Sequence, residues 1–332
     1  MVRISMQDIA DRLGISRGTV SLVLSGKAKS GRISEELQSK VKALAKELNY
    51  FHNEIARSLS TGVTKTIGVI VTDISNEFFG KMVFYIQEQA KSFAYSVIVV
   101  NTNECLEDFD EAVTILMNKQ VDGIILVPVE GGNKTVKNII NRKIPLVQID
   151  RFYPDINSNY IVIDNYDVSR KAVELLIEEG YKRIAVICYN IGLASLTERR
   201  QGWIDVMKER DLFDVELIKN IDYDNQDSEI EKAIIDLKND TDKVDAIFFC
   251  SRKVFLTGVK YMFKYDIKIP ENMHVICFDK IDAFTFANTP VTYIEQPIQQ
   301  VGQKAIDLLL DQIRGNDQIN HLVLNSEIKF SV

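Results

Sequence analysis

Charged and aromatic side chains follow the ends of four apolar runs along the chain. The four segments read "TDISNEFF" (72–79), "DRFYP" (150–154), "CSRK" (250–253) and "FDKID" (278–282). Their carboxylate and guanidinium groups can bind the hydroxyls of a small molecule or hold an anion, and the aromatic pair of the first segment can stack on a sugar or a base. Because ligands of α/β sheets bind at the carboxyl ends of strands, we expect one binding site to form there. Its candidate residues are Phe78, Phe79, Asp150, Arg151, Arg252 and Asp279.

The same residue types also have ordinary structural roles, which the sequence leaves open. An adjacent aromatic pair is common in a hydrophobic core, and a carboxylate at a strand end often caps a helix. Catalysis finds little support, because the three histidines (His52, His274 and His321) lack an evident nucleophile partner and no glycine-rich phosphate loop is present. The four cysteines are too far apart for a zinc site. The sequence therefore predicts a binding protein that is not an enzyme and uses no metal or cofactor.

The elements that would hold these residues alternate between apolar and amphipathic segments. Seven runs rich in β-branched residues are the expected strands: "TIGVIV", "YSVIVV", "DGIILV", "IPLVQI", "RIAVIC", "DAIFFC" and "HVICFD". Amphipathic stretches such as 80–93, 167–178 and 198–209 lie between them. Continuous apolar strands separated by helices indicate parallel sheets covered on both faces. The part of the chain from Thr66 onward is long for one such sheet, so we expect it to form two α/β subdomains.

The N-terminal segment differs from the rest of the chain in charge. Residues 1–62 carry ten lysine or arginine residues and six acidic ones, whereas the whole chain of 332 residues has a net charge of -7. Three helical segments are expected, with Ser5, Ser16 and Ser34 as N-caps and an apolar face after each. Two short helices joined by a turn at Gly14, with a third helix closing their core, predict a helix-turn-helix unit.

The second of these helices is the candidate for reading DNA. Val20 and Val23 form its buried side, so its N-terminal end and outer side would enter a major groove. Arg17 is the long donor suited to a guanine edge, and the neighbouring hydroxyls suit phosphates or base edges. A three-helix protein-interaction module is the alternative interpretation. The candidate DNA contacts in this unit are Ser5, Ser16, Arg17, Gly18, Thr19, Ser21, Leu22, Lys27 and Lys29.

The segment after the third helix is too short and too polar to form a core. Residues 53–60 can form a brief helix capped by Asn53, but so short a helix is not stable alone in water. Ala56 and Leu59 on one side of it would suit a wedge in the minor groove, and Arg57 adds a positive charge. An ordinary linker is the alternative.

Composition excludes several classes of protein. No apolar run is long enough to span a membrane, and the N-terminus lacks a secretion pattern. The acidic overall charge argues against a chain that is coated everywhere with nucleic-acid-binding groups. We therefore expect a cytoplasmic protein with no membrane contact, in which a basic module is attached to an acidic body.

The order of these motifs resembles the lac repressor family (LacI/GalR) of bacterial transcription regulators. The resemblance covers about residues 3 to 314 and rests on segments such as "QDIADRLGISRGTVSLVLSG", "NEIARSLSTGVTKTIGVIVTDISNEFF" and "IKIPENMHVICFDKID". It implies a helix-turn-helix domain (1–52), a hinge helix and linker (53–64) and a periplasmic-binding-protein-like core (65–332) of two doubly wound parallel-sheet subdomains. The subdomains would comprise about 65–161 with 293–322, and about 162–292 with 323–332.

The resemblance also implies what these parts do. The chain would bind a pseudo-palindromic double-stranded operator as a homodimer. A small-molecule effector, a sugar or sugar derivative, would bind between the subdomains and control formation of the hinge helix. The family's pocket positions add Arg199, Ser251 and Gln296 to the candidates for effector binding.

Departures from the family pattern bear on specificity. Leu22 stands where an arginine or lysine is usual, and Ser251-Arg252 replaces the usual Asn-Asp of the pocket. An arginine at position 252 suits an anionic effector, such as an acidic sugar or a sugar phosphate, but it could equally point to solvent. Two other classes of protein are alternatives: a sugar-binding or transport protein with the same core, and an enzyme acting on the same ligand. The N-terminal unit argues against the first, and the missing catalytic groups against the second.

Overall fold

The computed structural model describes residues 4–25, 28, 31–48, 50, 62–269, 271, 273–281 and 291–330 of the chain. The chain divides into two units after Thr64. Each unit is built around its own buried core. None of the described helices is both long and apolar enough to cross a membrane.

The N-terminal unit contains three helices, α1 (Met6–Leu13), α2 (Arg17–Leu24) and α3 (Glu35–Glu47). The serine N-caps expected from the sequence are confirmed at all three helix starts. At α1, Ser5 Oγ accepts from the Asp8 amide at 3.3 Å, and the Asp8 carboxylate accepts from the Ser5 amide at 2.7 Å. Gly14 ends α1 at a φ of 62°, a left-handed conformation that costs glycine little, and so permits the sharp turn into α2.

The three helices bury one small core between them. The predicted apolar faces are confirmed: Ile9, Ala10, Val20, Val23 and Val41 are buried, and half-buried leucines of the same unit pack around them. Leu22 is half-buried, because its side chain closes against Gly31 in the loop before α3. A Cβ at position 31 would lie 2.8 Å from Leu22 Cδ1, so the end of the Leu22 side chain would have to shift to admit one.

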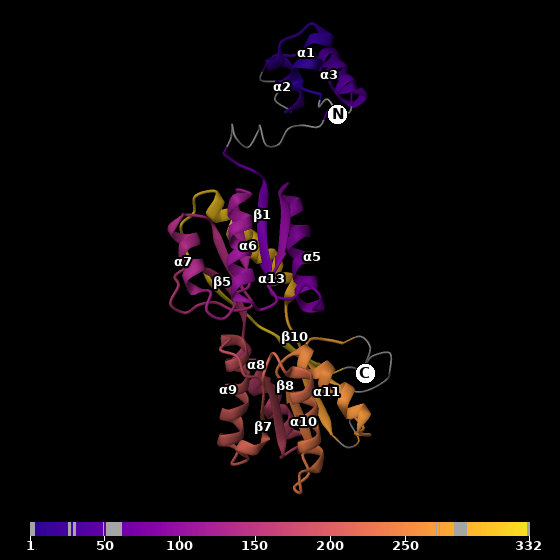
Figure 1. The fold of residues 1–332 in the computed structure, drawn as a ribbon, viewed down its shortest axis with the longest axis vertical. Helices are drawn as coiled ribbons and strands as arrows, with labels where there is room; N and C mark the ends of the chain where they lie inside the picture. Colours follow the sequence, from indigo (N-terminus) through magenta and orange to yellow (C-terminus); the bar gives the residue numbers. More distant parts are fainter. Residues whose placement is uncertain are drawn as a thin grey trace. The chain divides into compact units, whose positions relative to one another are not determined.

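The second unit contains two six-stranded sheets, each covered by helices on both faces (Figure 1). The first sheet has the order β11-β5-β4-β3-β1-β2 with all neighbours parallel. The second has the order β12-β10-β9-β8-β6-β7, parallel except for β12. The first sheet consists of β1 (Thr66–Val71), β2 (Ser96–Asn101), β3 (Gly123–Leu126), β4 (Leu146–Ile149), β5 (Asn159–Ile163) and β11 (His321–Leu324). The second consists of β6 (Ile184–Tyr189), β7 (Ile218–Ile221), β8 (Ala246–Phe249), β9 (His274–Phe278), β10 (Thr292–Glu295) and β12 (Glu327–Phe330).

The helices that cover the first sheet come from two distant parts of the chain, whereas those named for the second sheet are consecutive in the sequence. In the first lobe, α5 (Glu77–Ser92) and α13 (Ile298–Ile313) bury one face, and α6 (Leu106–Asn118) and α7 (Asn133–Asn141) bury the other. In the second lobe, α8 (Asn165–Glu178) packs beside α9 (Ala194–Glu209), and α10 (Gln226–Asn239) beside α11 (Arg252–Lys264). A 3-10 turn at Val215–Leu217 precedes β7.

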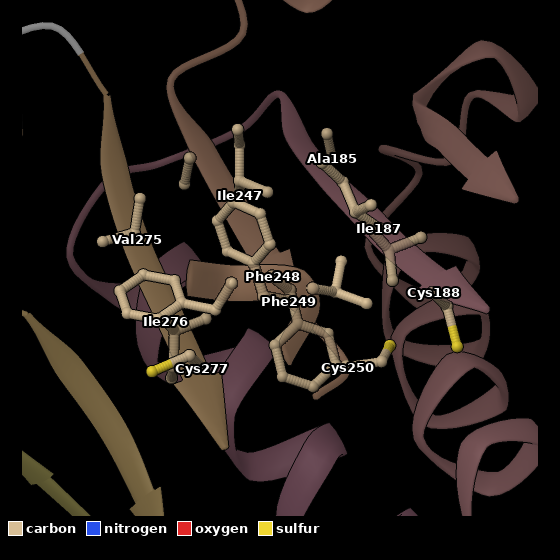
Figure 2. Close-up of a cluster of buried hydrophobic side chains, with 14 of the residues drawn as sticks. Ala185, Ile187, Cys188, Ile247, Phe248, Phe249, Cys250, Val275, Ile276 and Cys277 are labelled. Atoms are coloured by element: carbon tan, nitrogen blue, oxygen red, sulfur yellow. The ribbon is translucent and has the colours of Figure 1, made fainter. Parts of the chain in front are cut away.

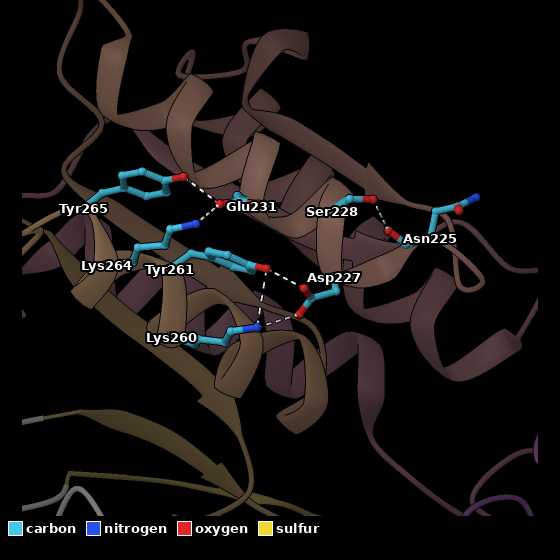
Figure 3. Close-up of polar contacts among 8 residues, drawn as sticks. All are labelled: Asn225, Asp227, Ser228, Glu231, Lys260, Tyr261, Lys264 and Tyr265. Atoms are coloured by element: carbon cyan, nitrogen blue, oxygen red, sulfur yellow. Dashed lines mark hydrogen bonds and ion pairs between the residues drawn. The ribbon is translucent and has the colours of Figure 1, made fainter.

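The core of the second lobe and its outer helix pair show two kinds of packing. Figure 2 shows apolar side chains of β6, β8 and β9, such as Ile187, Phe249 and Ile276, filling the interior. Figure 3 shows that α10 and α11 are joined instead by a polar ladder that repeats after one helical turn. The carboxylate of Asp227 accepts from Lys260 and Tyr261, and that of Glu231 accepts from Lys264 and Tyr265.

The seven predicted strands are all confirmed, but five strands were not predicted. The structure adds β5, β7, β10, β11 and β12. The chain crosses between the sheets a few residues away from the approximate subdomain boundaries expected from the sequence. β10 (Thr292–Glu295) pairs with β9 and so lies in the second lobe, whereas Val162–Ile163 and Val323–Leu324 belong to the sheet of the first lobe. The physical reason is that the chain completes a paired strand in one lobe before it crosses to the other lobe.

Candidate functional site

A cavity of about 100 Å³ lies between the two lobes of the second unit. Its walls are formed by residues that follow the ends of β1, β2 and β4 in the first lobe and of β6 to β10 in the second. Parallel strands bring their carboxyl ends to one edge of a sheet, where ligands of such folds bind. Each lobe therefore presents its loop residues to the same space.

All nine effector candidates named from the sequence line this one cavity. Although they are separated by up to 218 positions along the chain, the two sheets bring them together at their carboxyl edges. Their role in binding a ligand stays a prediction. The nine are Phe78, Phe79, Asp150, Arg151, Arg199, Ser251, Arg252, Asp279 and Gln296.

Arg151 is held rigidly in the wall of the first lobe. Its side chain is buried, with Nη2 2.6 Å from Glu104 Oε1 and 3.5 Å from Thr72 Oγ1. Its Nε lies 3.5 Å from Asp150 Oδ2 but makes no hydrogen bond. Burial opposes the positive charge, but Glu104 and Asp150 outweigh burial and raise the pKa of Arg151. Burial likewise raises the pKa of Asp150, against the attraction of Arg151 and Arg199.

Arg199 of α9 is the positive charge that both lobes share. Its Nε donates to Asn165 Oδ1 at 2.7 Å, and its Nη1 donates to the carbonyl of Cys250 at 2.8 Å. The guanidinium carbon lies 3.6 Å from the centre of the Phe278 ring. Burial lowers the pKa of Arg199, while the carboxylates of Asp150 and Asp279 oppose that effect. These contacts fix the guanidinium at the base of the cavity.

Asp279 is the carboxylate that the second lobe contributes to the cavity wall. It follows the end of β9, and its Oδ1 accepts from Gln296 Nε2 at 3.0 Å. Burial raises the pKa of Asp279 to about 6, although Arg199 and the hydrogen bond from Gln296 pull in the opposite direction. An aspartate with such a pKa changes charge near neutrality, unlike one exposed to water.

Arg252 is engaged by protein groups. Ser251 caps α11 by accepting from the amide of Val254 at 3.4 Å, and Arg252 is the first residue of that helix. Arg252 Nη1 donates to the carbonyl of Lys280 at 2.7 Å, and Nη2 forms an ion pair with Glu77 of the first lobe. With only 14% of its side chain exposed, Arg252 does not point to solvent. The solvent-facing alternative is therefore wrong, and an ion pair links the two lobes beside the cavity.

Two aromatic pairs contribute apolar surface. The rings of Phe78 and Phe79 lie 4.9 Å apart at 75°, and those of Tyr189 and Tyr223 lie 5.2 Å apart at 62°. Phe78 and Phe79 also belong to the core of the first lobe, so the core interpretation of this pair is confirmed and its contact with a ligand stays a prediction. Several other lining residues were not predicted from the sequence, although their place after the ends of β2, β6 and β7 is a signal that could have found them. They are Glu104, Tyr189, Ile191, Leu193, Ser195, Leu196 and Tyr223.

The formal charges of the cavity wall balance. Four acidic residues (Asp73, Glu104, Asp150 and Asp279) face four basic ones (Arg151, Arg199, Arg252 and Lys253). Among the residues that the structure describes, no group of three or more histidine, cysteine or acidic side chains is arranged to hold a metal ion.

The candidate DNA contacts of the N-terminal unit that the structure describes are either exposed or half-buried. Ser16, Arg17 and Gly18 are exposed at the start of α2, and Ser5 is exposed before α1. Thr19, Ser21 and Leu22 are half-buried, and the hydroxyls of Ser16 and Thr19 lie 2.9 Å apart. The remaining candidates lie outside the described residues: Lys27, Lys29, Asn53, Ala56, Arg57 and Leu59.

Two family models match the chain, one for each unit. Residues 5–53 match "Bacterial regulatory proteins, lacI family", and residues 64–330 match "Periplasmic binding proteins and sugar binding domain of LacI family". The ribose operon repressor of Halalkalibacterium halodurans is 30% identical over 309 residues, which cover 93% of this chain and 90% of the relative.

Solved structures show the same fold. The crystal structure of the lac repressor dimer bound to operator and the anti-inducer ONPF has a TM-score of 0.86 at 21% identity, covering 99% of both chains. A periplasmic binding protein/LacI transcriptional regulator from Alkaliphilus metalliredigens, complexed with D-xylulofuranose, has a TM-score of 0.68 at 26% identity. That match covers 80% of this chain and 97% of the other.

A helix-turn-helix unit together with a bilobed core around a cavity defines a DNA-binding regulator with a periplasmic-binding-protein-like sensor. The chain belongs to the LacI family of bacterial regulatory proteins, which confirms the resemblance found in the sequence. It is a transcriptional repressor with a core of the sugar-binding type, and its relatives are repressors rather than enzymes. A transport protein with the same core would leave residues 5–53 unexplained.

Proposed function

We propose that the chain binds a pseudo-palindromic operator as a homodimer and responds to a neutral, polyhydroxylated small molecule held between its lobes. One observation carries the effector part of the proposal. Nine residues from both lobes, each expected from the sequence alone to bind the effector, surround a single cavity at the carboxyl ends of the strands. A ligand that touches both lobes can change the free-energy difference between their arrangements, which is what a two-state sensor requires.

The balance of charge in the cavity favours a neutral effector. The ion pairs of Arg151 with Glu104 and of Arg252 with Glu77 satisfy two of the guanidinium groups inside the protein. Arg199 lies near carboxylates from both lobes. An anion that paired with one of these three guanidinium groups would have to displace a carboxylate and leave it unpaired, which is costly where that carboxylate is buried.

The mixture of rings and carboxylates favours a sugar or a sugar derivative. Aromatic faces such as those of Phe78 and Tyr223 can cover the apolar side of a sugar ring, while Asp150 and Asp279 can accept hydrogen bonds from its hydroxyls. The regulator from Alkaliphilus metalliredigens that holds D-xylulofuranose supports this class of ligand.

The proposed DNA contact begins with Arg17. Its side chain is exposed at the N-terminal end of α2, where a recognition helix presents residues to base edges. Replacement by alanine should weaken binding to the preferred operator by about 1–3 kcal/mol and relax base preference at one position in each half-site. Selection from random duplexes should yield a pseudo-palindrome for the native chain. A single unrepeated half-site would argue against the homodimer.

The proposed link between the two functions lies in the segment 53–60. Asn53, Ala56, Arg57 and Leu59 would contact the minor groove when this segment forms a helix on DNA. Coupling of roughly 1–3 kcal/mol between effector and operator is typical of such switches. The variant Leu59→Ala should weaken operator binding and leave effector affinity of the free protein unchanged. If the variant bound the operator as tightly as the native chain, Leu59 would not act as a minor-groove wedge.

A thermal-shift screen tests the effector. A compound that binds only the native state raises the melting temperature, so neutral sugars, sugar acids, sugar phosphates and nucleobases can be compared directly. We expect hits among neutral sugars, and loss of those hits in Asp279→Asn. The matched control is Asp227→Asn on the outer ladder of α10, which should keep them. Hits confined to sugar acids or sugar phosphates would overturn the neutral assignment.

A further inference from the structure

Two buried cysteines that are far apart in the sequence meet in the second lobe. Cys188 lies on β6, and Cys250 directly follows β8. Both thiols are free and buried. Figure 2 shows the two cysteines at the ends of neighbouring strands, with Cys277 on the next strand of the sheet.

The register of the sheet places the two thiols side by side. Ile187 pairs with Phe249, so the next residues along the parallel strands are Cys188 and Cys250, and the amide of Cys250 donates to the carbonyl of Ile187 at 3.0 Å. Parallel neighbours lie about 4.8 Å apart and point to the same face of the sheet. That separation falls within the range of about 4.4–6.8 Å between Cα atoms that a disulfide bridges.

The register also excludes the third cysteine of this sheet. Cys277 pairs with Phe249, so it stands one position out of step with Cys250. Successive side chains along a strand point to opposite faces, and the thiol of Cys277 therefore lies on the other side of the sheet. It donates to the carbonyl of Asp279 at 3.7 Å instead.

The cysteine pair lies directly behind the wall of the cavity. Tyr189 and Ser251, the residues that follow the two cysteines, both line the cavity. The thiol of Cys188 donates to the carbonyl of Leu196 at 3.6 Å, and Arg199 donates to the carbonyl of Cys250 at 2.8 Å. Leu196 and Arg199 are lining residues as well. A small solute that enters the cavity thus contacts the residues next in sequence to the two cysteines.

The two thiols differ in acidity. The hydrogen bond from Cys250 lowers the pKa of the Cys188 thiol, while burial raises the pKa of Cys250. Since the thiolate is the nucleophile in thiol oxidation, Cys188 is the member that reacts first.

We propose that Cys188 and Cys250 form an oxidation site at which hydrogen peroxide converts the two thiols to a disulfide behind the cavity. The Cys188 thiolate attacks one peroxide oxygen, an S–O bond forms as the O–O bond breaks, and the departing oxygen leaves as water after taking up a proton. Cys250 then attacks the sulfur of the sulfenic acid, the S–S bond forms, and the second oxygen leaves as water. Two thiols and one hydrogen peroxide thus give one disulfide and two waters.

Formation of this bond would alter the second lobe locally. The sulfur atoms must approach to about 2.05 Å, which takes Cys188 away from the carbonyl of Leu196 at the start of α9. Trp203, the only tryptophan of the chain, lies on the same helix and donates to the carbonyl of Ile184 on β6 at 3.2 Å. Its fluorescence therefore reports on the contact between α9 and β6.

The test uses the full-length protein and graded hydrogen peroxide. After alkylation of free thiols in denaturant, peptide mapping without reductant should find Cys188 joined to Cys250. The emission of Trp203 should change in parallel, and dithiothreitol should reverse both. The variants Cys105→Ala and Cys277→Ala should form the same disulfide at a similar rate. Cys250→Ala should instead leave Cys188 as a sulfenic acid that a sulfenic-acid-specific reagent captures.

Other outcomes would overturn the proposal. Cys105 is the one cysteine that is not buried, and its exclusive oxidation would show that peroxide does not reach the pair. Separate oxidation of Cys188 and Cys250 without a disulfide would show that the strands cannot bring the sulfurs together. Because wild-type protein alone yields these results, a folding defect in a variant does not obscure them.

Discussion

The two lobes of the core share one strand order but hold their cavity carboxylates in different ways. Asp150 directly follows β4 and Asp279 directly follows β9, the corresponding strands of the two sheets. Both have left-handed backbones, with φ of 68° and 67°. Each amide donates to the next strand, Asp150 to the carbonyl of Ile161 at 3.1 Å and Asp279 to that of Ile294 at 2.8 Å. The backbone therefore repeats at the two positions.

The neighbours of the two carboxylates do not repeat. Asp150 lies beside Arg151, which is itself tied to Glu104, whereas the hydrogen-bond partner of Asp279 is the uncharged amide of Gln296. The first lobe thus contributes a fixed ionic network, and the second contributes a carboxylate with a pKa near neutrality. One backbone turn can therefore serve two electrostatic roles, and the adjoining side chains decide which.

In both lobes a glycine lets two paired helices approach closely, but it lies on a different helix in each lobe. The first lobe joins α5 to α13 through Gly302 of α13, and the second joins α8 to α9 through Gly202 of α9. In each case a backbone lies where a Cβ would stand. In the first lobe the glycine lies on α13, which enters from the second lobe after β10. In the second lobe it lies on α9, which follows β6, the first strand of that lobe.

The largest expected effect follows from removing the charge that both aspartates share. Arg199→Met should lower the free energy of unfolding by about 3–5 kcal/mol, because it leaves buried carboxylates of both lobes without their common cation. Urea unfolding measures the loss. The control is Arg200→Met on the same helix, where the guanidinium contacts the exposed Asn220 and the loss should be small. Equal losses in both variants would show that Arg199 does not connect the lobes electrostatically.

A second prediction concerns the pH dependence of Asp279. Its folded pKa of about 6 exceeds the ordinary value of 3.8, so the stability it contributes is fully present below about pH 4 and is lost as pH rises through 6. Asp279→Asn removes the charge and should raise the free energy of unfolding at pH 8 by up to about 3 kcal/mol, with no gain below pH 4.

Unfolding curves of the two proteins at pH 4 and pH 8 measure this difference. Asp150→Asn sharpens the comparison between lobes, because it also removes a counter-charge from Arg151 and should therefore yield a smaller gain. A gain for Asp279→Asn that does not vary with pH would contradict the assignment of the raised pKa to this carboxylate.

A third prediction tests the close packing of the helix pairs. A Cβ on Gly202 would lie 2.7 Å from the carbonyl oxygen of Tyr166, so Gly202→Ala should destabilise the core by about 1–3 kcal/mol. The matched control is Gly80→Ala on α5, where the nearest atom lies at 3.7 Å and the helix should be unaffected or slightly stabilised. Thermal melting of the two variants measures both effects, and indistinguishable melting temperatures would show that α8 and α9 can separate freely.

The smallest effect is expected at the ion pair that links the lobes. Glu77 is 43% exposed, so its pairing with Arg252 should contribute no more than about 1 kcal/mol to stability. A double-mutant cycle with Glu77→Gln and Arg252→Gln measures the coupling, which should fall as salt is added. Strong coupling that is insensitive to salt would mean that the pair is shielded from water.

Much of the fold and the composition of the candidate site could be predicted from the sequence. Six of the seven predicted strands read as continuous apolar runs because both of their faces are buried, whereas β2 is a half-buried edge strand. The serine caps and Gly14 mark helix ends through local hydrogen bonds and backbone freedom. The five strands that were missed are short, at most five residues long, and three of them lie at sheet edges. Such strands carry a weak pattern, because solvent covers one side and their pairing partners lie far away in the chain.

By itself the sequence determined the helix-turn-helix unit, the alternation of strands and helices, the family and the residues that gather at the strand ends. These depend on local periodicity and on residue type. Only the tertiary structure decided that Arg252 pairs with Glu77, that Asp279 faces an amide while Asp150 faces an arginine, and that Cys188 meets Cys250. Each of these pairings joins residues on different elements, and strand register and burial, which no local pattern records, set their distances and their charges.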